Sequence, residues 1–454
     1  EIEYLARRLG FAGPGAGAEF LARYHQHGAA IRAVFDRYLG EEAAGAFAGD
    51  DDRVAPAIVA HVRRMAPSYH ATFGDDEIAR HAEMVARIDD AHPVEVAATP
   101  LEDGAWRVTV VGYDYPGELA LICGLLFVYG LTIDDGHVFT YEQAEEPTSL
   151  GVWSPHARRR TREPVPDRRL KIVDVFTVRS VSGQAPADMW PFYEDDLTAL
   201  LRHLHHGQPR AAYGEVAKRA ALAIEEVPGA PLALQPIDIA IDNDASERYT
   251  VLRIEAPDTP GFLYEFTSAL ALGGVYIAQM SVDSAGSRAR DVLYLTDGSG
   301  AKIVDPAKQR ELRAVTVLVK HFAHLLPRSP NPESALLHFR DLLSELLARP
   351  DWPDELSSLE RPEILGALAR LLGVSDFLWE DFLRFQHADL LPLVKDLDAL
   401  AMAKPPAQLR EELCAALAAA PEREARRAAL NAFKDREMFR IDMRHIQGQA
   451  ADFG

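Results

Sequence analysis

Apolar positions change their spacing along the chain, and these changes divide it into a helical start, an alternating middle and a helical end. Residues 1–94 follow the three-to-four-residue spacing of amphipathic helices, and the acidic run at 75–77 suits the start of a helix that reaches about Ile88. Between 95 and 326, short strand-like runs separate helical stretches. Beyond the proline-rich linker at 327–332 only helical spacing is left. The pattern predicts an α+β middle between two helical regions.

The middle contains one element order twice. Arg107–Gly117 and Tyr249–Gly261 each read as a strand that ends in an Asp-x-Pro-Gly turn, and each is followed by an apolar helix that stops at a glycine. Matching positions lie at one offset of 144 residues, pairing Asp114, Pro116, Gly117, Gly130 and Ile133 with Asp258, Pro260, Gly261, Gly274 and Ile277. A repeat at constant offset predicts two copies of one structural module.

Each copy continues with two strands and a helix, which predicts a βαββαβ ferredoxin-like sandwich with helices on one face of an antiparallel sheet. The third strands match at an offset of 117, so the first copy is 27 residues longer, and the excess falls in the Arg/Pro-rich stretch 142–169. We expect one helical stretch at 186–223 and a strand at 235–242 that closes the first module. The modules are placed at 95–245 and 246–326.

The end of the chain, 333–454, lacks strand signals and predicts an all-α domain. Prolines punctuate its helical stretches. We expect helices at 336–347, 364–372, 377–385, 390–400, 409–417 and 425–446.

Composition narrows the class of protein. The 454 residues, 48% hydrophobic and 26% charged, suit several globular domains, and the net charge of −21 argues against a nucleic-acid partner. The sequence contains no run of about 18 apolar residues, the length that would predict a membrane-spanning helix. Cys123 and Cys414 lie far apart in apolar helical patterns, which favours buried thiols in a reducing cytoplasm over a disulfide or metal site. Because the chain opens with Glu1, we expect it to be a fragment of a longer protein.

The two turns are the candidate ligand sites. Proline presets φ, glycine lets another group approach the backbone closely, and the free N–H groups at the following helix start suit an anion such as an amino-acid carboxylate. Taken one at a time, each turn is equally explained as a tight connection that packs helix on sheet. The candidate ligand-binding residues are Asp114, Pro116, Gly117 and Glu118 in the first copy and Asp258, Pro260, Gly261 and Phe262 in the second.

These residues carry a resemblance. Both copies resemble ACT domains, small regulatory modules that often bind amino acids, and the stretch 239–263 looks like the tandem ACT region of protein-PII uridylyltransferases. The usual turn of that family is Asp-Arg-Pro-Gly-Leu-Leu. Here Tyr115 and Thr259 replace the arginine, and Glu118 and Phe262 replace the first leucine. The resemblance covers about 95–326 and implies the fold more firmly than the identity of a ligand.

The flanking regions resemble a different family. Leu5–Phe11, Phe20–Tyr24, Ile31–Phe35, Leu371–Leu378 and, most specifically, Phe433–Arg444 look like helical sequence of glutamine-synthetase adenylyltransferases. In that family an Arg-Glu-Met-x-Arg-Ile helix leads toward a nucleotidyltransferase domain, whose Gly-Ser turn and Asp-x-Asp pair hold magnesium. This chain offers only decoys for that motif, at Asp50–Asp52, Asp242–Asp244, and Gly286–Ser287 with Asp291, so we expect no catalytic residue in it.

The resemblances imply a regulatory, amino-acid-sensing span of a nitrogen-metabolism nucleotidyltransferase whose catalytic domain lies outside. The implied parent reaction is AMP transfer to glutamine synthetase with ATP and Mg²⁺, while the span itself needs no cofactor. The implied partners are an effector, with glutamine as first guess, glutamine synthetase, and PII signalling protein as a further candidate. One alternative is a structural or protein-interaction module, in which the ACT sheets pair within or between chains without a ligand. A complete enzyme is the third, and acidic spacing does not support it.

Other polar clusters have simpler explanations. His203, His205 and His206 suit the end of a helix better than a metal site. The histidines at 61, 70 and 81 lack the aspartate neighbours of a metal-dependent hydrolase. The arginine cluster at 158–162 reads as a solvated loop, with a nucleotide, an RNA or an acidic protein as rarer partners.

Overall fold

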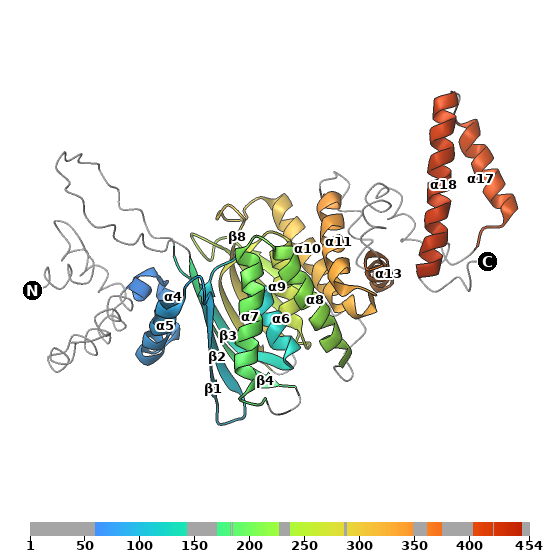
Figure 1. Ribbon diagram of the computed structural model, residues 1–454. Helices are drawn as coiled ribbons and strands as arrows, with labels where there is room; N and C mark the ends of the chain where they lie inside the picture. The colour runs from blue at the N-terminus through green and yellow to red at the C-terminus, as the bar shows by residue number, and fades with distance from the viewer. Residues whose placement is uncertain are drawn as a thin grey trace, which may run out of the picture.

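The computed structural model describes residues 60–142, 170–181, 183, 185–226, 237–285, 288–347, 361–374, 403–420 and 422–446. The expectations for 1–59, the arginine cluster at 158–162 and the helices at 377–385 and 390–400 lie outside these residues. The described chain is built around one eight-stranded antiparallel sheet with helices on both faces (Figure 1). No helix in the described ranges combines the length and the apolar composition needed to cross a membrane.

The first repeat contributes four strands and three helices. A hairpin of β1 (Val94–Pro100) and β2 (Trp106–Tyr113) leads through the first Asp-x-Pro-Gly turn into α6 (Glu118–Val128). Strands β3 (Leu131–Thr140) and β4 (Lys171–Ser180) follow, with β4 inserted between β2 and β3. The stretch predicted as one helix is two, α7 (Met189–His205) and α8 (Pro209–Glu226), because Gly207 takes a φ of +70° and Pro209 starts a new helix.

The second repeat copies this arrangement. A hairpin of β5 (Asp238–Asp242) and β6 (Thr250–Pro257) leads through the second turn into α9 (Phe262–Leu272), then β7 (Tyr276–Ala285), β8 (Arg288–Thr296) and α10 (Pro306–His324). The strand predicted to close the first module is β5, and it pairs with β6 of the second repeat. The second repeat therefore runs ββαββα, and the first runs ββαββαα because its last helical stretch is divided, in place of the expected βαββαβ. In each repeat the edge strand (β1 or β5) pairs with the strand that leads into the turn (β2 or β6), but it precedes that strand in the sequence instead of ending the repeat. This is possible because a hairpin is enough to join antiparallel neighbours.

The repeats join edge to edge inside the chain. Strands β3 and β7 pair antiparallel from Asp135–Asp283 to Phe139–Gln279, which gives the order β1-β2-β4-β3-β7-β8-β6-β5. β3 and β7, the two central strands of the eight-stranded sheet, carry a register shift at equivalent places, Ile133/Asp135 and Ile277/Gln279. Helices α6 and α9 pack against each other on the same face. The sequence repeat is thus a spatial repeat that forms one continuous sheet.

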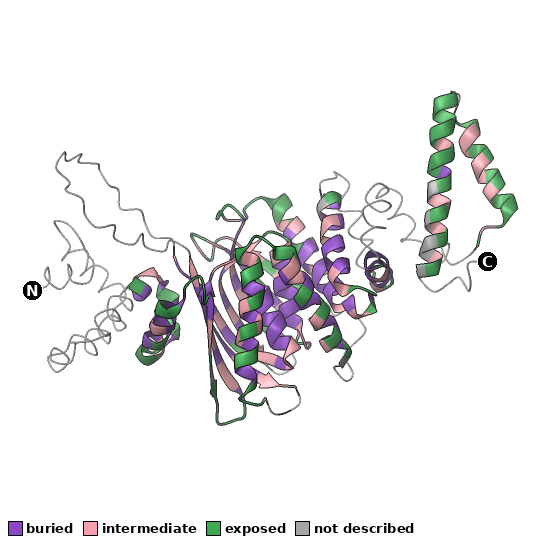
Figure 2. Ribbon diagram, in the orientation of Figure 1, coloured by how far each residue is buried: buried purple, intermediate pink, exposed green. Residues whose placement is uncertain are grey.

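Each face of the first repeat's sheet has its own core. Alternate residues such as Val108 and Val110 pack under α6, while Val111 and Val173 face α4 (Pro67–Thr72) and α5 (Asp75–Arg87). Figure 2 shows the buried residues concentrated where the helices meet the sheet. The sheet of the first repeat is therefore covered on both sides, not on one as predicted.

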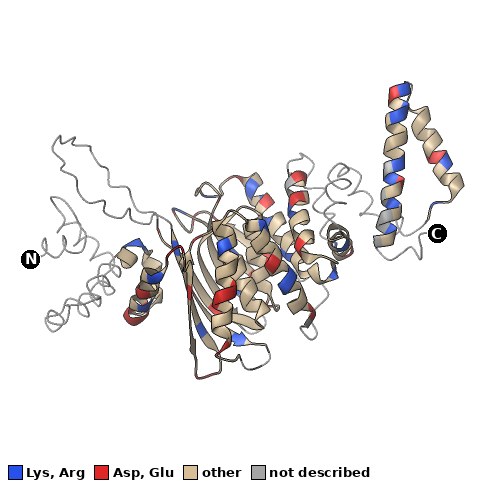
Figure 3. Cartoon of the chain, viewed as in Figure 1, with Lys and Arg blue, Asp and Glu red and all other residues tan. Residues whose placement is uncertain are grey.

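The C-terminal helices continue the layer on the α6–α9 face. Helices α11 (Pro332–Leu347) and α13 (Pro362–Leu372) share an apolar core with α8, α9 and α10. Further on, α17 (Pro406–Ala418) packs with α18 (Arg423–Ile446), and charged residues are frequent along α18 (Figure 3). Cys123 is buried in α6, but Cys414 is exposed, because α17 has no buried residue among those described.

Candidate functional site

Both Asp-x-Pro-Gly turns adopt the same backbone geometry. Gly117 and Gly261 are the N-cap residues of α6 and α9 and take left-handed φ values of +82° and +78°. A side chain would be strained at either place. Each turn ends in a helix start whose first N–H is used within the turn, since Glu118 N donates to the Tyr115 carbonyl at 3.0 Å and Phe262 N to the Thr259 carbonyl at 2.8 Å.

The first turn forms the wall of a cavity of about 580 Å³ between the repeats. Asp114, Pro116 and Gly117 come from the first repeat, while Tyr276 and Ala278 come from β7 of the second. Arg248 and Tyr249 stand on the same wall. A ligand in this cavity would contact both repeats.

The second turn forms the wall of the counterpart cavity, of about 200 Å³. Asp258, Pro260, Gly261 and Phe262 line it from the second repeat, and the facing side is residues 131–134 of β3 with Cys123 and Phe127. Each cavity thus combines the turn of one repeat with the central strand of the other.

Seven of the eight candidate ligand-binding residues are therefore cavity residues, and Glu118 is the exception. Glu118 is 5% exposed, and burial raises the pKa of its carboxyl well above the ordinary value, with Asp114 and Asp174 adding to the effect. Their role in ligand binding stays a prediction.

Sequence reasoning missed the residues that the facing strand contributes. Thr132 and Asp134 line the second cavity, and Tyr276 and Ala278 line the first. The same offset of 144 that relates the turns also relates these two pairs, so it could have revealed them. What it could not reveal is that each turn faces the other repeat.

Carboxylates near the turns range from buried Asp291 through half-buried Asp114 to exposed Asp258. Burial raises the pKa of Asp114 to about 6, against an opposing hydrogen bond from the Tyr276 hydroxyl. Burial likewise raises the pKa of Asp291 to about 7, with Asp258 and Asp283 nearby, and raises that of Asp258. Both oxygens of Asp291 are buried without a side-chain partner, and a hydrogen bond from the Asp283 backbone opposes the rise in its pKa. Such groups readily accept a hydrogen-bonding cation.

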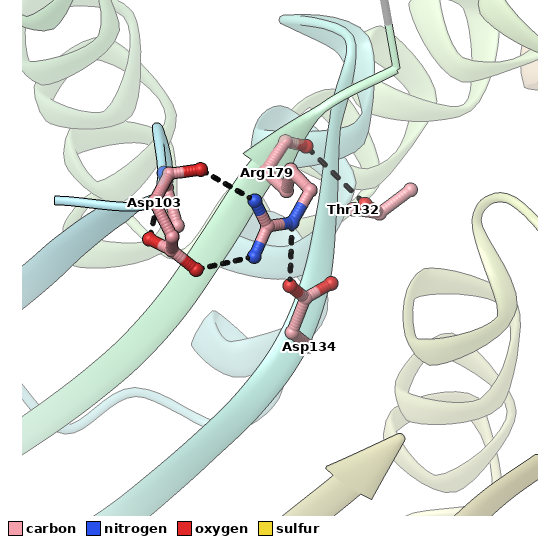
Figure 4. Close-up of polar contacts among 5 residues, drawn as sticks. Asp103, Thr132, Asp134 and Arg179 are labelled. Carbon is pink, nitrogen blue, oxygen red and sulfur yellow. Dashed lines mark hydrogen bonds and ion pairs between the residues drawn. The ribbon is translucent and has the colours of Figure 1, made fainter. Parts of the chain in front are cut away.

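Asp134 at the second cavity is held by an arginine bridge. Arg179 of β4 donates to Asp134 at 3.1 Å and to Asp103 at 2.7 Å, and Thr132 donates to the Arg179 carbonyl at 3.2 Å (Figure 4). The bridge is partly exposed, so its contribution to stability is modest. The bridge instead helps to hold β3, the strand that faces the second turn, in position.

The other polar clusters have structural partners. The His206 ring bonds the Arg202 carbonyl at 2.6 Å, and the rings of His203 and His205 bond Gln208 and Tyr115. Within the described residues, no group of three or more potential ligands is placed to hold a metal ion.

Two of the three decoys for a catalytic acid pair include described residues. Asp242 accepts the backbone N–H groups of Asp244 and Ala245, which is an ordinary turn. Asp291 is buried in β8, while Asp50–Asp52 and Gly286–Ser287 lie outside the described residues.

The N-terminal helices hold a buried hydrogen-bonded chain. The two ring nitrogens of His61 bond the hydroxyls of Tyr141, at 2.7 Å, and Tyr69, at 2.9 Å, and Tyr69 also bonds His81 at 2.7 Å. Burial holds the pKa of His61 well below its usual value and lowers that of His81 to about 3. Both rings are therefore neutral and structural.

Comparison with known proteins relates the chain to two kinds of nucleotidyltransferase. A model of the glutamate-ammonia ligase adenylyltransferase family matches residues 305–452, from the start of α10 onward. A bifunctional uridylyltransferase/uridylyl-removing enzyme of Gluconobacter oxydans is 30% identical over 253 residues, or 54% of this chain and 23% of that protein. Similar enzymes of Rhodopseudomonas palustris (27% over 260 residues, 57% and 25%) and Rhodospirillum rubrum (28% over 254 residues, 54% and 23%) also match.

The similarity to both kinds of nucleotidyltransferase that was suspected from the sequence is confirmed, while the assignment of the repeats to ACT domains stays a prediction. The chain spans about a quarter of the length of the curated relatives it matches.

Proposed function

We propose that this chain is the amino-acid-sensing, regulatory span of a nitrogen-metabolism nucleotidyltransferase whose catalytic domain lies outside it, and that the two repeats are ACT modules. One observation carries the proposal: two cavities lie between the repeats, each formed by an Asp-x-Pro-Gly turn of one repeat and the central strand of the other. A ligand held there contacts both copies and therefore fixes their relative position.

The chemistry of these cavities suits an α-amino acid. A carboxylate is stabilised by the free N–H groups at a helix start, and an ammonium group by a buried carboxylate. Each cavity lies at a helix start and offers a carboxylate, which is half-buried Asp114 in the first and buried Asp291 beside exposed Asp258 in the second. Glutamine is the first effector to test, because the uridylyltransferase and adenylyltransferase relatives point to nitrogen metabolism.

Contacts between the turns and the C-terminal helices support a regulatory role. Tyr213 of α8 donates to the Pro116 carbonyl at 2.8 Å, and Arg210 of the same helix bonds Asp341 of α11 at 3.0 Å. Gly274 and Val275 line both the first-turn cavity and a further cavity of about 340 Å³ bounded by α10 and α11. A shift of the first turn would reach the adenylyltransferase-like helices through these contacts.

The proposed parent activity is AMP transfer from ATP, with Mg²⁺, to glutamine synthetase in the cytoplasm, with PII protein as a further candidate partner. The adenylyltransferase match over 305–452 supports this assignment. The proposed effector would alter the parent's rate without touching the reacting atoms.

Titration calorimetry of the chain with glutamine, and then with each other amino acid, tests the sensor role. We expect saturable heat with at least one amino acid and a higher unfolding temperature in its presence. Absence of both with every amino acid would reject sensing.

A second candidate function is a structural or interaction module that binds no small molecule. The direct bond from Tyr276 to Asp114 favours it, because one turn carboxylate already has a partner inside the chain. Under this alternative, the outer edge strands β1 and β5 are the surfaces open to another chain. Light scattering with and without amino acids separates the two, since only sensing predicts a ligand-dependent change.

A further inference from the structure

The two turn cavities occupy equivalent places but have different chemistry. At the offset of 144, Tyr276 corresponds to Thr132, and Ala278 corresponds to Asp134. Because each strand faces the turn of the other repeat, these differences lie directly opposite the two turn aspartates.

In the first cavity, the protein itself bonds one oxygen of the turn carboxylate, while Oδ1 of Asp114 is buried without a hydrogen-bond partner. The Tyr276 hydroxyl donates a hydrogen bond to Oδ2 of Asp114. The tyrosine therefore occupies the position from which a ligand's ammonium group would reach this carboxylate. The nearest buried acid on the sheet, Asp174, is not among the residues that line this cavity.

In the second cavity, the place of the tyrosine is taken by a shorter side chain that turns away. The Thr132 hydroxyl donates to the Arg179 carbonyl oxygen, so it leaves Asp258 without a tyrosine-like partner. The small hydroxyl of Ser284 is the side-chain group that bonds Asp258.

A buried carboxylate faces the same cavity as Asp258. Asp291 lines the wall, is 1% exposed, and has no side-chain hydrogen-bond partner at either oxygen, with the Asp283 backbone as its polar neighbour. Asp134 completes a set of three acids, and no lysine or arginine is among the described residues of the wall. Of these three acids, Arg179 bonds only Asp134, at 3.1 Å. A cavity with this lining lacks a positive charge of its own.

We propose that, of the two turn cavities, only the second binds an ammonium group, with Asp258 and Asp291 as the groups that hold the ligand, and that Tyr276 acts in the first cavity as a built-in substitute for it. The proposal rests on the proposed sensor function and goes beyond it, because it assigns one ligand per chain and names the residue that closes the other site. The ligand class is a small α-amino acid or amine.

Calorimetry on the full chain, with L-glutamine as probe, tests the assignment. We expect one molecule bound per chain, at least tenfold weaker binding in Asp258→Asn and in Asp291→Asn, and retained binding in Asp114→Asn. Glutaramic acid, which is glutamine without its amino group, should give no saturable heat. Circular dichroism of each variant reports whether it is folded.

Exchanging the two facing residues is the sharper test. Tyr276→Thr gives the first cavity the residue of the second and should raise the stoichiometry from one to two. Thr132→Tyr should reduce binding at least tenfold. Two ligands bound by the unmodified chain, tight binding of glutaramic acid, or loss of binding in Asp114→Asn alone would overturn the proposal while leaving sensing intact. If no amino acid binds the unmodified chain, both fail together.

Discussion

A buried ion pair between α9 and α10 allows a quantitative test of how the second turn is attached to the helical layer. Nζ of Lys320 lies 3.1 Å from Oε2 of Glu265, and their side chains are 4% and 0% exposed. His324 bonds the other oxygen of Glu265 at 2.8 Å, and the Lys320 ammonium lies 5.4 Å from the centre of the Phe262 ring. Removing one member of such a pair leaves an uncompensated charge in an apolar layer.

The expected cost of Lys320→Met is about 3 kcal/mol, at the lower end of the range for breaking a buried pair, because His324 still contacts the carboxylate. The repeat supplies the apolar replacement for its partner, since Leu121 of α6 stands at the position equivalent to Glu265. The double variant Glu265→Leu with Lys320→Met should lie within about 1 kcal/mol of the unmodified chain or be more stable.

Urea unfolding of the four members of this cycle, followed by tryptophan fluorescence and circular dichroism, measures the coupling. Trp106 and Trp190, whose rings are 5.6 Å apart, report on the first repeat. The reasoning would be refuted if Lys320→Met cost less than about 1 kcal/mol, or if the two single changes simply added, as distant sites do to within about 0.5 kcal/mol.

Three further predictions concern the turns and their carboxylates. In urea unfolding, Gly117→Ala should destabilise the chain by at least about 1 kcal/mol more than Gly104→Ala. Both glycines have φ of +82°, but only at Gly117 would the new Cβ lie 1.9 Å from the Tyr213 hydroxyl. Equal effects of the two changes would contradict this prediction. Asp291→Asn should stabilise the chain at pH 8 by a few kcal/mol, on the order expected from linkage. The pKa of Asp291 rises from 3.8 to about 7 on folding, so its protonated form favours the fold, and stability declines as pH rises through that window; an unchanged pH profile in the variant would argue against it. Glutamine binding at pH 6.5 should release up to about one proton, since an ammonium group favours ionised Asp291, and calorimetry in buffers of different ionisation heat should show unequal apparent heats.

Local chemistry made much of the repeat predictable. Helices α6 and α9 begin directly after Gly117 and Gly261, and Gly130 and Gly274 follow their ends with φ of +73° and +69°. A proline followed by a left-handed glycine before an apolar run leaves little freedom in where a helix starts, and α+β composition follows from the alternating runs.

Strand partners were beyond local reasoning. The run that became β5 has the same alternation whether it pairs with the first repeat or with β6, and its short hairpin with β6 decided the matter. In the same way, the candidate site could be located at Asp114 and Asp258, but Tyr276 and Thr132 could not be assigned to opposite turns without the β3–β7 pairing. That pairing depends on which two sheet edges meet, and hydrophobic spacing does not encode it.

The β3–β7 junction also has an evolutionary consequence. When two identical chains pair through such an edge, each mutation appears at both symmetry-related sites, so neither can change alone. Fusion of the two copies into one polypeptide removes that restriction, because a codon change at 276 leaves 132 untouched. A tyrosine can then fill the ligand position in the first cavity while the second cavity keeps its acidic residues. Gene duplication thereby permits a division of labour between halves that a symmetric dimer could not reach.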